Sequence, residues 1–237
     1  MNIAAMNIAA LNIGVIGAGR LGGTLARLWV ERGHQVAIAN SRGPETLAGL
    51  VTRLGPGARA LTSAGAAEFG DVIVVSVPWG HYRELPVRGT AGKPVVDTNN
   101  YYPQRDGHIS ELDDGSTTSS ELLQRHLPAA KVVKAFNQVR WTSLGEDGLP
   151  PGTAGRVVIP IAGDDAWAKA VVAGLIDEIG FDVVDTGPLA TGALYKPDAS
   201  LYLANAAHTS TMPTSTTGSG SRSASHPQRD PRNYGTG

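Results

Sequence analysis

Residues 12–22 read NIGVIGAGRLG, an apolar run of strand length that leads directly into the spacing G-x-G-x-x-G. This spacing is typical of a dinucleotide-binding turn between a strand and a helix. Gly17 would allow the tight turn, Gly19 would let a pyrophosphate approach the backbone, and Gly22 would let the helix pack close to the strand. Three glycines alone are weak evidence in a chain with 30 glycines, so the sequence around them decides whether the turn is interpreted as a dinucleotide site.

The pattern after the glycines favours the dinucleotide interpretation. Leu21, Leu25, Leu28 and Trp29 recur with helical period, and Gly33 closes the segment. A second apolar run, QVAIAN at 35–40, completes strand, helix and strand within about 30 residues, the size of a βαβ unit. We therefore expect the whole turn to contact the dinucleotide, namely Gly17, Ala18, Gly19, Arg20, Leu21 and Gly22.

The end of the second strand indicates which dinucleotide binds. Enzymes that bind NAD usually carry Asp or Glu there, which accepts hydrogen bonds from the ribose 2′-hydroxyl. This chain has Asn40, followed by Ser41 and Arg42. A carboxylate would repel a 2′-phosphate, whereas an amide, a hydroxyl and a guanidinium can hold one by charge-assisted hydrogen bonds. The sequence therefore favours NADP(H) over NAD, the alternative being that Arg42 is a solvated loop charge.

Composition and charge fit a globular enzyme. The 237 residues are 41% hydrophobic, and 20 basic against 21 acidic side chains give a formal net charge of -1. The charges are interspersed and the apolar runs are short, so neither nucleic acid nor a membrane is an expected partner. The chain has no cysteine, which leaves redox chemistry to a bound organic cofactor. We expect a cytoplasmic location.

The rest of the chain alternates helices and strands, which predicts an α/β fold with a Rossmann-type, doubly wound, mostly parallel sheet. We expect a helix at 44–54 and strands at 58–61, 71–77 and 94–98. Ligands of such sheets bind beyond the carboxyl ends of the strands. Val77, Pro78 and Asn99 should therefore contact the cofactor, and Trp79 should either stack on a ring or pack in the core.

The C-terminal half predicts further elements. Thr118 and Glu121 have the spacing of a capping box that opens a helix ending at 127, and a strand follows at 131–136. After a Gly- and Pro-rich break at 145–155, we expect a strand at 156–162, a helix at 164–179 and a strand at 181–185. Asn137 follows a strand and is a cleft candidate, with a structural role as the alternative. The acidic pairs at 113–114 and 164–165 are interpreted as solvated caps.

These patterns divide the chain into four parts. They are an N-terminal extension at 1–11, an NADP-binding Rossmann domain at 12–144, a small α/β part at 145–203 and a disordered tail at 204–237. The extension repeats MNIAA, so Met6 is an alternative start. The tail has too few apolar residues to offset the entropy cost of ordering. Its abrupt change of composition suggests a shifted reading frame as a hypothesis.

With these motifs the chain resembles the NADP oxidoreductases that use an 8-hydroxy-5-deazaflavin coenzyme, coenzyme F420, and relatives with a pyrroline-5-carboxylate-reductase-like NADP-binding domain. The resemblance covers residues 12–202 and rests on IGAGRLG at 16–22, NSRGP at 40–44, VPW at 77–79, DTNNYYP at 97–103, VKAFN at 133–137 and IAGDD at 161–165. It implies a Rossmann domain, NADP specificity through Ser41 and Arg42, and a cleft shared with the smaller C-terminal part.

The resemblance also implies direct hydride transfer between the nicotinamide C4 and a deazaflavin ring stacked on it. Such a reaction depends on proximity and exclusion of water, so we expect no catalytic acid or base; His81 is the nearest titratable side chain. Trp79, Tyr101 and Asn137 would form the site of this small-molecule co-substrate. The chain is expected to act alone or as a homodimer.

Other interpretations stay open. A binding module could sense the NADP redox state without turnover, or a reductase could act on a flavin or an imine. The chain has no Tyr-x-x-x-Lys pair, which excludes the proton relay of short-chain dehydrogenases. His34, His108 and His126 lack the spacing of metal ligands, so no metal site is expected.

Overall fold

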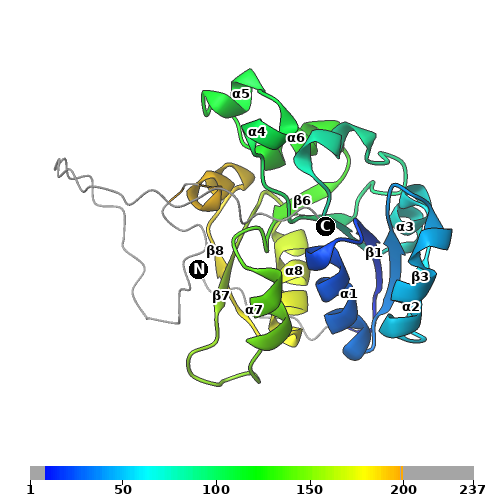
Figure 1. Cartoon of the computed structure of the whole chain (residues 1–237). Coiled ribbons are helices and arrows are strands. Elements are labelled where there is room, and N and C mark those ends of the chain that lie inside the picture. Colours follow the sequence, from blue (N-terminus) through cyan, green and yellow to red (C-terminus); the bar gives the residue numbers. More distant parts are fainter. Residues whose placement is uncertain (1–8, 198, 200–237) are drawn as a thin grey trace.

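The computed structural model describes residues 9–197 and 199. Figure 1 shows the helices and strands coloured along the chain. They follow in the order β1 (Asn12–Ile16), α1 (Arg20–Glu31), β2 (Gln35–Ala39), η1 (Pro44–Leu47), α2 (Ala48–Leu54), β3 (Ala58–Ala60), α3 (Ser63–Phe69), β4 (Val72–Val75), η2 (Trp79–Glu84), β5 (Pro94–Asp97), α4 (Pro103–Asp106), α5 (Ser110–Asp113), α6 (Ser119–His126), β6 (Lys131–Lys134), α7 (Trp141–Glu146), β7 (Val158–Gly163), α8 (Ala166–Glu178), β8 (Asp182–Asp185) and η3 (Leu189–Tyr195), where η denotes a 3-10 helix.

The strands form one eight-stranded sheet in the order β3-β2-β1-β4-β5-β6-β7-β8. All pairings are parallel except that of β6 with β7, which is antiparallel. After β3 the chain crosses back to β4, so β1 and β4 lie side by side at the switch point where doubly wound sheets bind nucleotides. The predicted Rossmann-type, doubly wound and mostly parallel α/β fold is confirmed.

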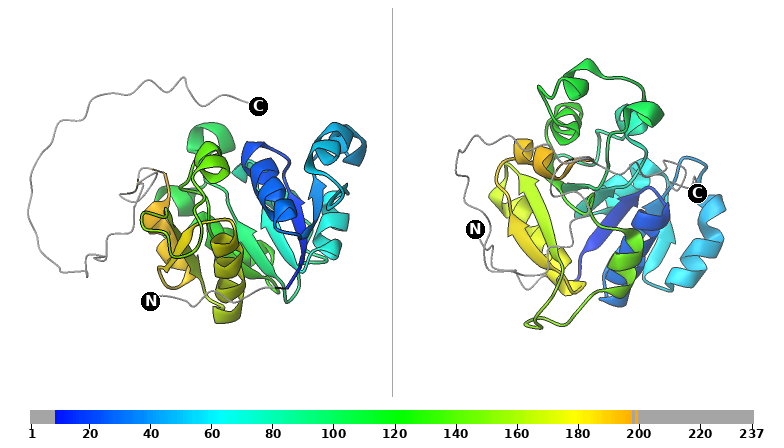
Figure 2. Two further views of the ribbon diagram at one scale, coloured as in Figure 1. Left: turned by 90° about the horizontal axis from the view of Figure 1, so that it is seen from below. Right: turned by 60° about the vertical axis from the view of Figure 1, so that its left-hand side comes forward.

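Helices cover both faces of the sheet (Figure 2). On one face Leu25 and Trp29 of α1 share a core cluster with Leu175 of α8, and Trp29 Nε1 donates to the Leu175 carbonyl at 3.2 Å. On the other face Ala66 of α3 and Leu123 of α6 belong to a second cluster. The central strands are buried on both faces, which explains why their sequences are apolar without alternation.

Several boundaries differ from those that the sequence predicts. The helix expected at 44–54 begins as the 3-10 helix η1 and continues as α2, while α3, α4 and α5 were not expected. The strand expected at 131–136 ends at Lys134, because Phe136 takes a φ of 64° that no strand can accommodate. The capping box of α6 is confirmed, since Glu121 N donates to Thr118 Oγ1 at 3.2 Å and Thr118 N donates to Glu121 Oε2 at 2.7 Å.

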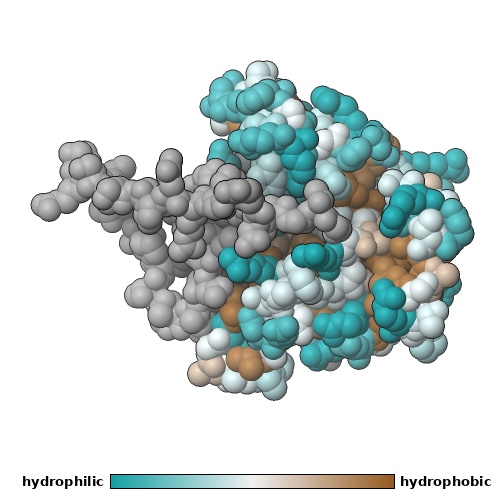
Figure 3. Space-filling view, in the orientation of Figure 1, coloured by the Kyte–Doolittle hydropathy of each residue, from teal (hydrophilic) through white to brown (hydrophobic). Residues whose placement is uncertain are grey.

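The segment at 145–203 contributes β7, α8 and β8 to the same sheet, and α8 packs across β5 and β6. Its separation as a small second part stays a prediction, and the predicted tail lies outside the described residues. On the face shown in Figure 3, apolar residues gather where α1 and α2 lie together, from which Leu28 and Leu50 pack partly buried against the core. Within residues 9–197, no helix is long and apolar enough to cross a membrane.

Candidate functional site

Three glycines shape the turn between β1 and α1. Gly17 has a φ of 115°, which L-residues rarely adopt, and a Cβ there would strike the carbonyl of Ser76 at the end of β4. A Cβ on Gly22 would strike the Gly17 carbonyl, so the predicted close packing of the helix at Gly22 is confirmed. A Cβ on Gly19, in contrast, would meet nothing within 4 Å. The space outside Gly19 is therefore open to a ligand that approaches the backbone.

The start of α1 offers positive potential to an anion. Its N-cap, Gly19, supplies no side-chain hydrogen bond, and the first turn holds no acidic residue. The first N–H groups of a helix have no intrahelical partner, and the helix dipole makes this end positive. Arg20 in the first turn lies over the ring of Trp141, with its guanidinium carbon 5.5 Å from the ring centre. This end therefore suits the pyrophosphate of a dinucleotide.

The loop after β2 lies next to the glycine turn, because β1 and β2 are paired. The Asn40 side chain organises this loop: its Oδ1 accepts from Arg42 N at 3.0 Å and its Nδ2 donates to Thr46 Oγ1 at 2.9 Å. Ser41 and Arg42 are exposed. Over the described part of the chain, no carboxylate forms an ion pair with Arg42. Asn40 thus positions the loop, and Ser41 and Arg42 are left to meet a ligand.

Asn99 ties the end of β5 to the end of β4. Its Oδ1 accepts from Val77 N at 2.9 Å, while its Nδ2 is buried and has no partner among the described residues. Pro78 is exposed beside it. Trp79 is fully buried, and its ring stacks on Tyr82 with 4.4 Å between the ring centres. The indole therefore packs in the core, which was the alternative, and presents no face to a substrate ring.

Asn137 lies in the turn after β6. Its Nδ2 donates to Asn100 Oδ1 at 3.0 Å and to the Tyr195 carbonyl at 2.9 Å, and Asn100 Nδ2 donates back to the Asn137 carbonyl at 2.8 Å. Its Oδ1 is buried without a partner among the described residues. Phe136, just before it, has the φ of 64° already noted, which costs about 1–3 kcal/mol for a bulky residue. Such strain is typical of turns that hold a functional side chain in place.

A buried ion pair that sequence reasoning missed joins β5 to β6. Lys134 Nζ lies 3.2 Å from Asp97 Oδ2 and also donates to the Asn99 carbonyl. Asp97 is fully buried and accepts from Ser120 Oγ at 2.7 Å and from Asn99 N at 3.0 Å. Burial lowers the pKa of Lys134, and the Asp97 carboxylate opposes that shift. The ion pair therefore fixes the backbone that carries Asn99.

A cavity of about 570 Å³ opens beside this ion pair, beyond the ends of β5 and β6. Its walls come from the loop after β5, from α5, from the start of α6 and from η3, and include Asn100, Tyr101, His108, Ser119, Lys134 and Lys196. The Tyr101 hydroxyl donates to Asp113 Oδ1 at 2.7 Å and accepts from Ile109 N at 2.9 Å. Burial and then the bond to Asp113 raise the pKa of Tyr101. The volume is in the range of small-molecule sites.

The two acidic pairs that the sequence assigned as caps have different roles. Asp165 is confirmed as the N-cap of α8, because its Oδ1 accepts from Ala168 N at 2.8 Å. The assignment of Asp113 as a cap is corrected, since it lies at the end of α5 and bonds Tyr101 and, at 2.9 Å, His108 Nδ1. These two bonds lower the pKa of the Asp113 carboxyl.

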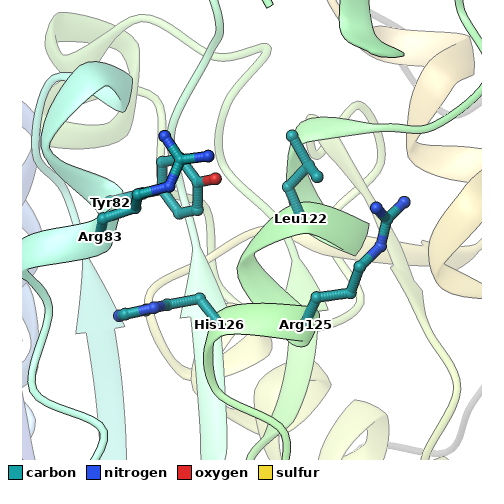
Figure 4. A pocket seen from close by; sticks show the side chains of 5 residues that line it. All are labelled: Tyr82, Arg83, Leu122, Arg125 and His126. Carbon is teal, nitrogen blue, oxygen red and sulfur yellow. The ribbon is translucent and has the colours of Figure 1, made fainter.

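A shallower hollow of about 410 Å³ lies between η2 and α6 (Figure 4). Tyr82 and Arg83 face Leu122, Arg125 and His126 across it. Arg125 is held by Glu111 at 2.9 Å, and His126 Nε2 lies 3.0 Å from the Leu85 carbonyl. Because these polar groups already have partners within the protein, the hollow is a weaker ligand candidate than the cavity beyond β5 and β6.

Most of the predicted site residues meet along one edge of the sheet. The residues expected to bind the cofactor lie at the carboxyl ends of β1, β2, β4 and β5, namely Gly17, Ala18, Gly19, Arg20, Leu21, Gly22, Asn40, Ser41, Arg42, Val77, Pro78 and Asn99. Tyr101 and Asn137 lie farther along this edge, whereas His81 is exposed on η2 and bonds Glu84 at 2.9 Å. The direct contacts of these residues with NADP(H) remain predictions.

Comparison with known proteins agrees with this geometry. The family model "NADP oxidoreductase coenzyme F420-dependent" matches residues 12–101, which include the glycine turn and the ends of β2, β4 and β5. The crystal structure of a hypothetical protein from Sinorhizobium meliloti is 30% identical, with a TM-score of 0.72, over 85% of this chain and 97% of that one.

Two further relatives extend the comparison. The structure of a protein from Arthrobacter sp. FB24, provisionally described as an F420-dependent NADP reductase, is 27% identical with a TM-score of 0.67 and covers 77% of this chain and 87% of that one. The metalloreductase STEAP3 of Rattus norvegicus is 32% identical over 71% of this chain, which spans only 32% of that protein. Residues 12–101 of the chain therefore match the family of coenzyme F420-dependent NADP oxidoreductases, and the chain shares its fold with the Sinorhizobium and Arthrobacter proteins over most of its length.

Proposed function

We propose that the chain transfers hydride between NADP(H) and a deazaflavin of the coenzyme F420 type. The pyrophosphate would lie against Gly19 and the start of α1, the 2′-phosphate against Ser41 and Arg42, and the nicotinamide toward Asn99. The deazaflavin would occupy the cavity beyond β5 and β6. When bound, the two rings supply the hydride donor and acceptor, so the protein itself needs no redox-active side chain.

The observation that carries this proposal is the cavity of about 570 Å³ on the same edge of the sheet as the glycine turn. A module that only senses the NADP redox state needs the dinucleotide site alone. An oxidoreductase needs a second site next to the nicotinamide, and the cavity, on the same edge of the sheet, is large enough to serve as one. The family model and the Arthrobacter relative support a deazaflavin as its occupant.

The residues of the chain would bind and orient the two rings. Arg42 would select the 2′-phosphate, Asn99 would hold the Val77 loop, and the partly buried Tyr101 ring would form one wall for the deazaflavin. The histidines nearest the site, His81 and His108, are exposed and bonded to carboxylates, so neither is assigned a proton-transfer role. Proximity and orientation alone can account for roughly 7–11 kcal/mol of a barrier.

The test is an anaerobic assay of NADPH oxidation with oxidised deazaflavin, FMN or a cyclic imine as acceptor. We expect turnover with the deazaflavin and NADPH, and much slower turnover with NADH. Ala193→Phe, which places a ring in the cavity, should raise the KM for the deazaflavin and leave the Kd for NADPH unchanged. Leu194→Phe, at an exposed neighbouring position outside the cavity wall, is the matched control. Tight NADPH binding without turnover for any acceptor would contradict the proposal and favour a sensor.

A further inference from the structure

Two asparagines at the edge of the sheet each have one polar atom with no partner among the described residues. Asn99 and Asn137 are both only 5% exposed. Within the described residues, Asn99 Nδ2 lacks an acceptor and Asn137 Oδ1 lacks a donor. Buried polar atoms are costly to leave unpaired, so nearly all of them in native proteins have a partner. Trp79 Nε1 and Gln138 Oε1 are also buried without a partner among the described residues. The two asparagines differ from them in offering one donor and one acceptor from adjacent loops, the pair that a carboxamide ligand would complement.

The neighbours of each amide determine which of its atoms is left over. Oxygen and nitrogen of an asparagine amide are otherwise assigned only by inference. The Val77 N–H can only donate, so Asn99 must turn its oxygen toward it and keep its NH2 group unpaired. The Tyr195 carbonyl can only accept, so Asn137 must turn its NH2 group toward it and keep its oxygen unpaired. The polarity of both sites is thus fixed by the backbone.

Both amides lie at the nicotinamide end of the expected dinucleotide site. Asn99 is bonded to Val77, and the preceding residue, Ser76, packs directly against Gly17 in the glycine turn. Asn137 is held beside the loop of Asn99 by its reciprocal bonds with Asn100. A dinucleotide whose pyrophosphate lies at the glycine turn extends its nicotinamide across β4 toward these ends of β5 and β6.

We infer that Asn99 and Asn137 together bind the carboxamide of the nicotinamide, Asn99 as the donor to its oxygen and Asn137 as the acceptor from its NH2 group. This inference rests on the proposed function, because it requires NADP(H) at the switch point. It assigns Asn137 to the cofactor instead of the co-substrate. Because both atoms are buried, the ring would reach them only if the loops after β5 and β6 moved apart. The pair then fixes which face of the nicotinamide turns toward the cavity.

Analogues of NADP+ test the two bonds one at a time by isothermal titration calorimetry. The 3-acetylpyridine analogue replaces the NH2 group by a methyl group and removes the bond to Asn137. The thionicotinamide analogue replaces the carboxamide oxygen by sulfur and weakens the bond to Asn99. 2′-Phospho-ADP-ribose lacks the nicotinamide and reports only on the remainder of the site. For the wild-type protein we expect each analogue to bind about 3- to 10-fold more weakly than NADP+, the effect of one hydrogen bond.

Two variants complete the cycle. Asn99→Asp keeps the bond from Val77 N and loses the donor, and Asn137→Ala loses the acceptor. We expect Asn137→Ala to bind NADP+ and the acetylpyridine analogue equally, and Asn99→Asp to lose its preference for NADP+ over the thionicotinamide analogue. Both variants should bind 2′-phospho-ADP-ribose as tightly as the wild-type protein does.

Two results overturn the inference. One is an equal loss of affinity for 2′-phospho-ADP-ribose and NADP+ in the variants, which would mean that the two asparagines support the structure of the site and do not bind the nicotinamide. The other is wild-type protein that binds NADP+ and both analogues alike, a result that does not depend on the variants being folded. Failure of the proposed function is distinct: wild-type protein would then bind NADPH without turnover for any acceptor, or would bind neither NADP+ nor 2′-phospho-ADP-ribose.

Discussion

Gly19→Val tests whether a pyrophosphate approaches the backbone at the glycine turn. A Cβ at this position meets nothing within 4 Å, and the φ of -73° and ψ of -171° suit an L-residue. The substitution should therefore lower the free energy of unfolding by about 1 kcal/mol or less, the effect of a poorer N-cap. The methyl groups would occupy the place of phosphate oxygens. We expect NADPH affinity to fall at least about 100-fold, or about 2.7 kcal/mol.

Two comparison variants separate binding from folding. Gly23→Val, one turn later in α1, also meets nothing within 4 Å and should leave NADPH affinity unchanged at a similar small cost in stability. Gly17→Ala, in contrast, should lower the free energy of unfolding by about 2–4 kcal/mol, because residue 17 has a φ of 115° and an added Cβ would strike the Ser76 carbonyl.

Urea unfolding followed by circular dichroism gives the stabilities, and NADPH fluorescence titration gives the affinities. The reasoning is refuted if Gly19→Val binds NADPH as tightly as the wild-type protein, or if Gly19→Val and Gly23→Val lose the same affinity.

Three further predictions follow from single contacts. Arg42→Ala should weaken the binding of NADP+ by about 1.5–3 kcal/mol in calorimetry and leave the binding of NAD+ nearly unchanged, because only the 2′-phosphate loses a charge-assisted bond. Equal losses of affinity for NADP+ and NAD+ would contradict the 2′-phosphate site. Lys134→Met or Asp97→Asn alone should lower the free energy of unfolding in urea by about 3–5 kcal/mol, because each leaves a buried charge uncompensated. The double variant should recover much of that loss. Additive losses in the double variant would mean that the two side chains are not coupled. Asp165 has a pKa lowered first by the bond from Ala168 N, so its contribution is present at neutral pH and lost as pH falls through the lowered pKa; the difference in Tm between wild type and Asp165→Ala should shrink in acid, and a constant difference would refute it.

Local sequence signals predicted the features that depend on neighbouring residues. The roles of Gly17 and Gly22 follow from the backbone geometry of one turn, and both are seen in the structure. The capping box of Thr118 and Glu121 is likewise a pattern within four residues, and it forms as expected. Apolar runs of strand length predicted the central strands, because strands buried on both faces cannot alternate.

Features that depend on contacts distant in sequence were not predictable in the same way. The ion pair of Asp97 and Lys134 forms only because β5 and β6 pair in a register that brings them opposite each other. The only hint of this ion pair in the sequence was a charged residue at the end of each of the two apolar runs. Trp79 is a residue whose position in the sequence suggested a ligand contact that the structure does not support. It follows β4, but the 3-10 turn of η2 directs its ring onto Tyr82.

Isotope transfer tests the central claim most directly. NADPH carrying deuterium at one face of the nicotinamide C4 is mixed with the protein and oxidised deazaflavin without oxygen, and the products are analysed by mass spectrometry and NMR. Direct hydride transfer between a bound nicotinamide and a bound deazaflavin predicts deuterium on the reduced deazaflavin from one face of C4 only. Reduced deazaflavin without deuterium from either face, or no reduction although NADPH binds, would contradict the account.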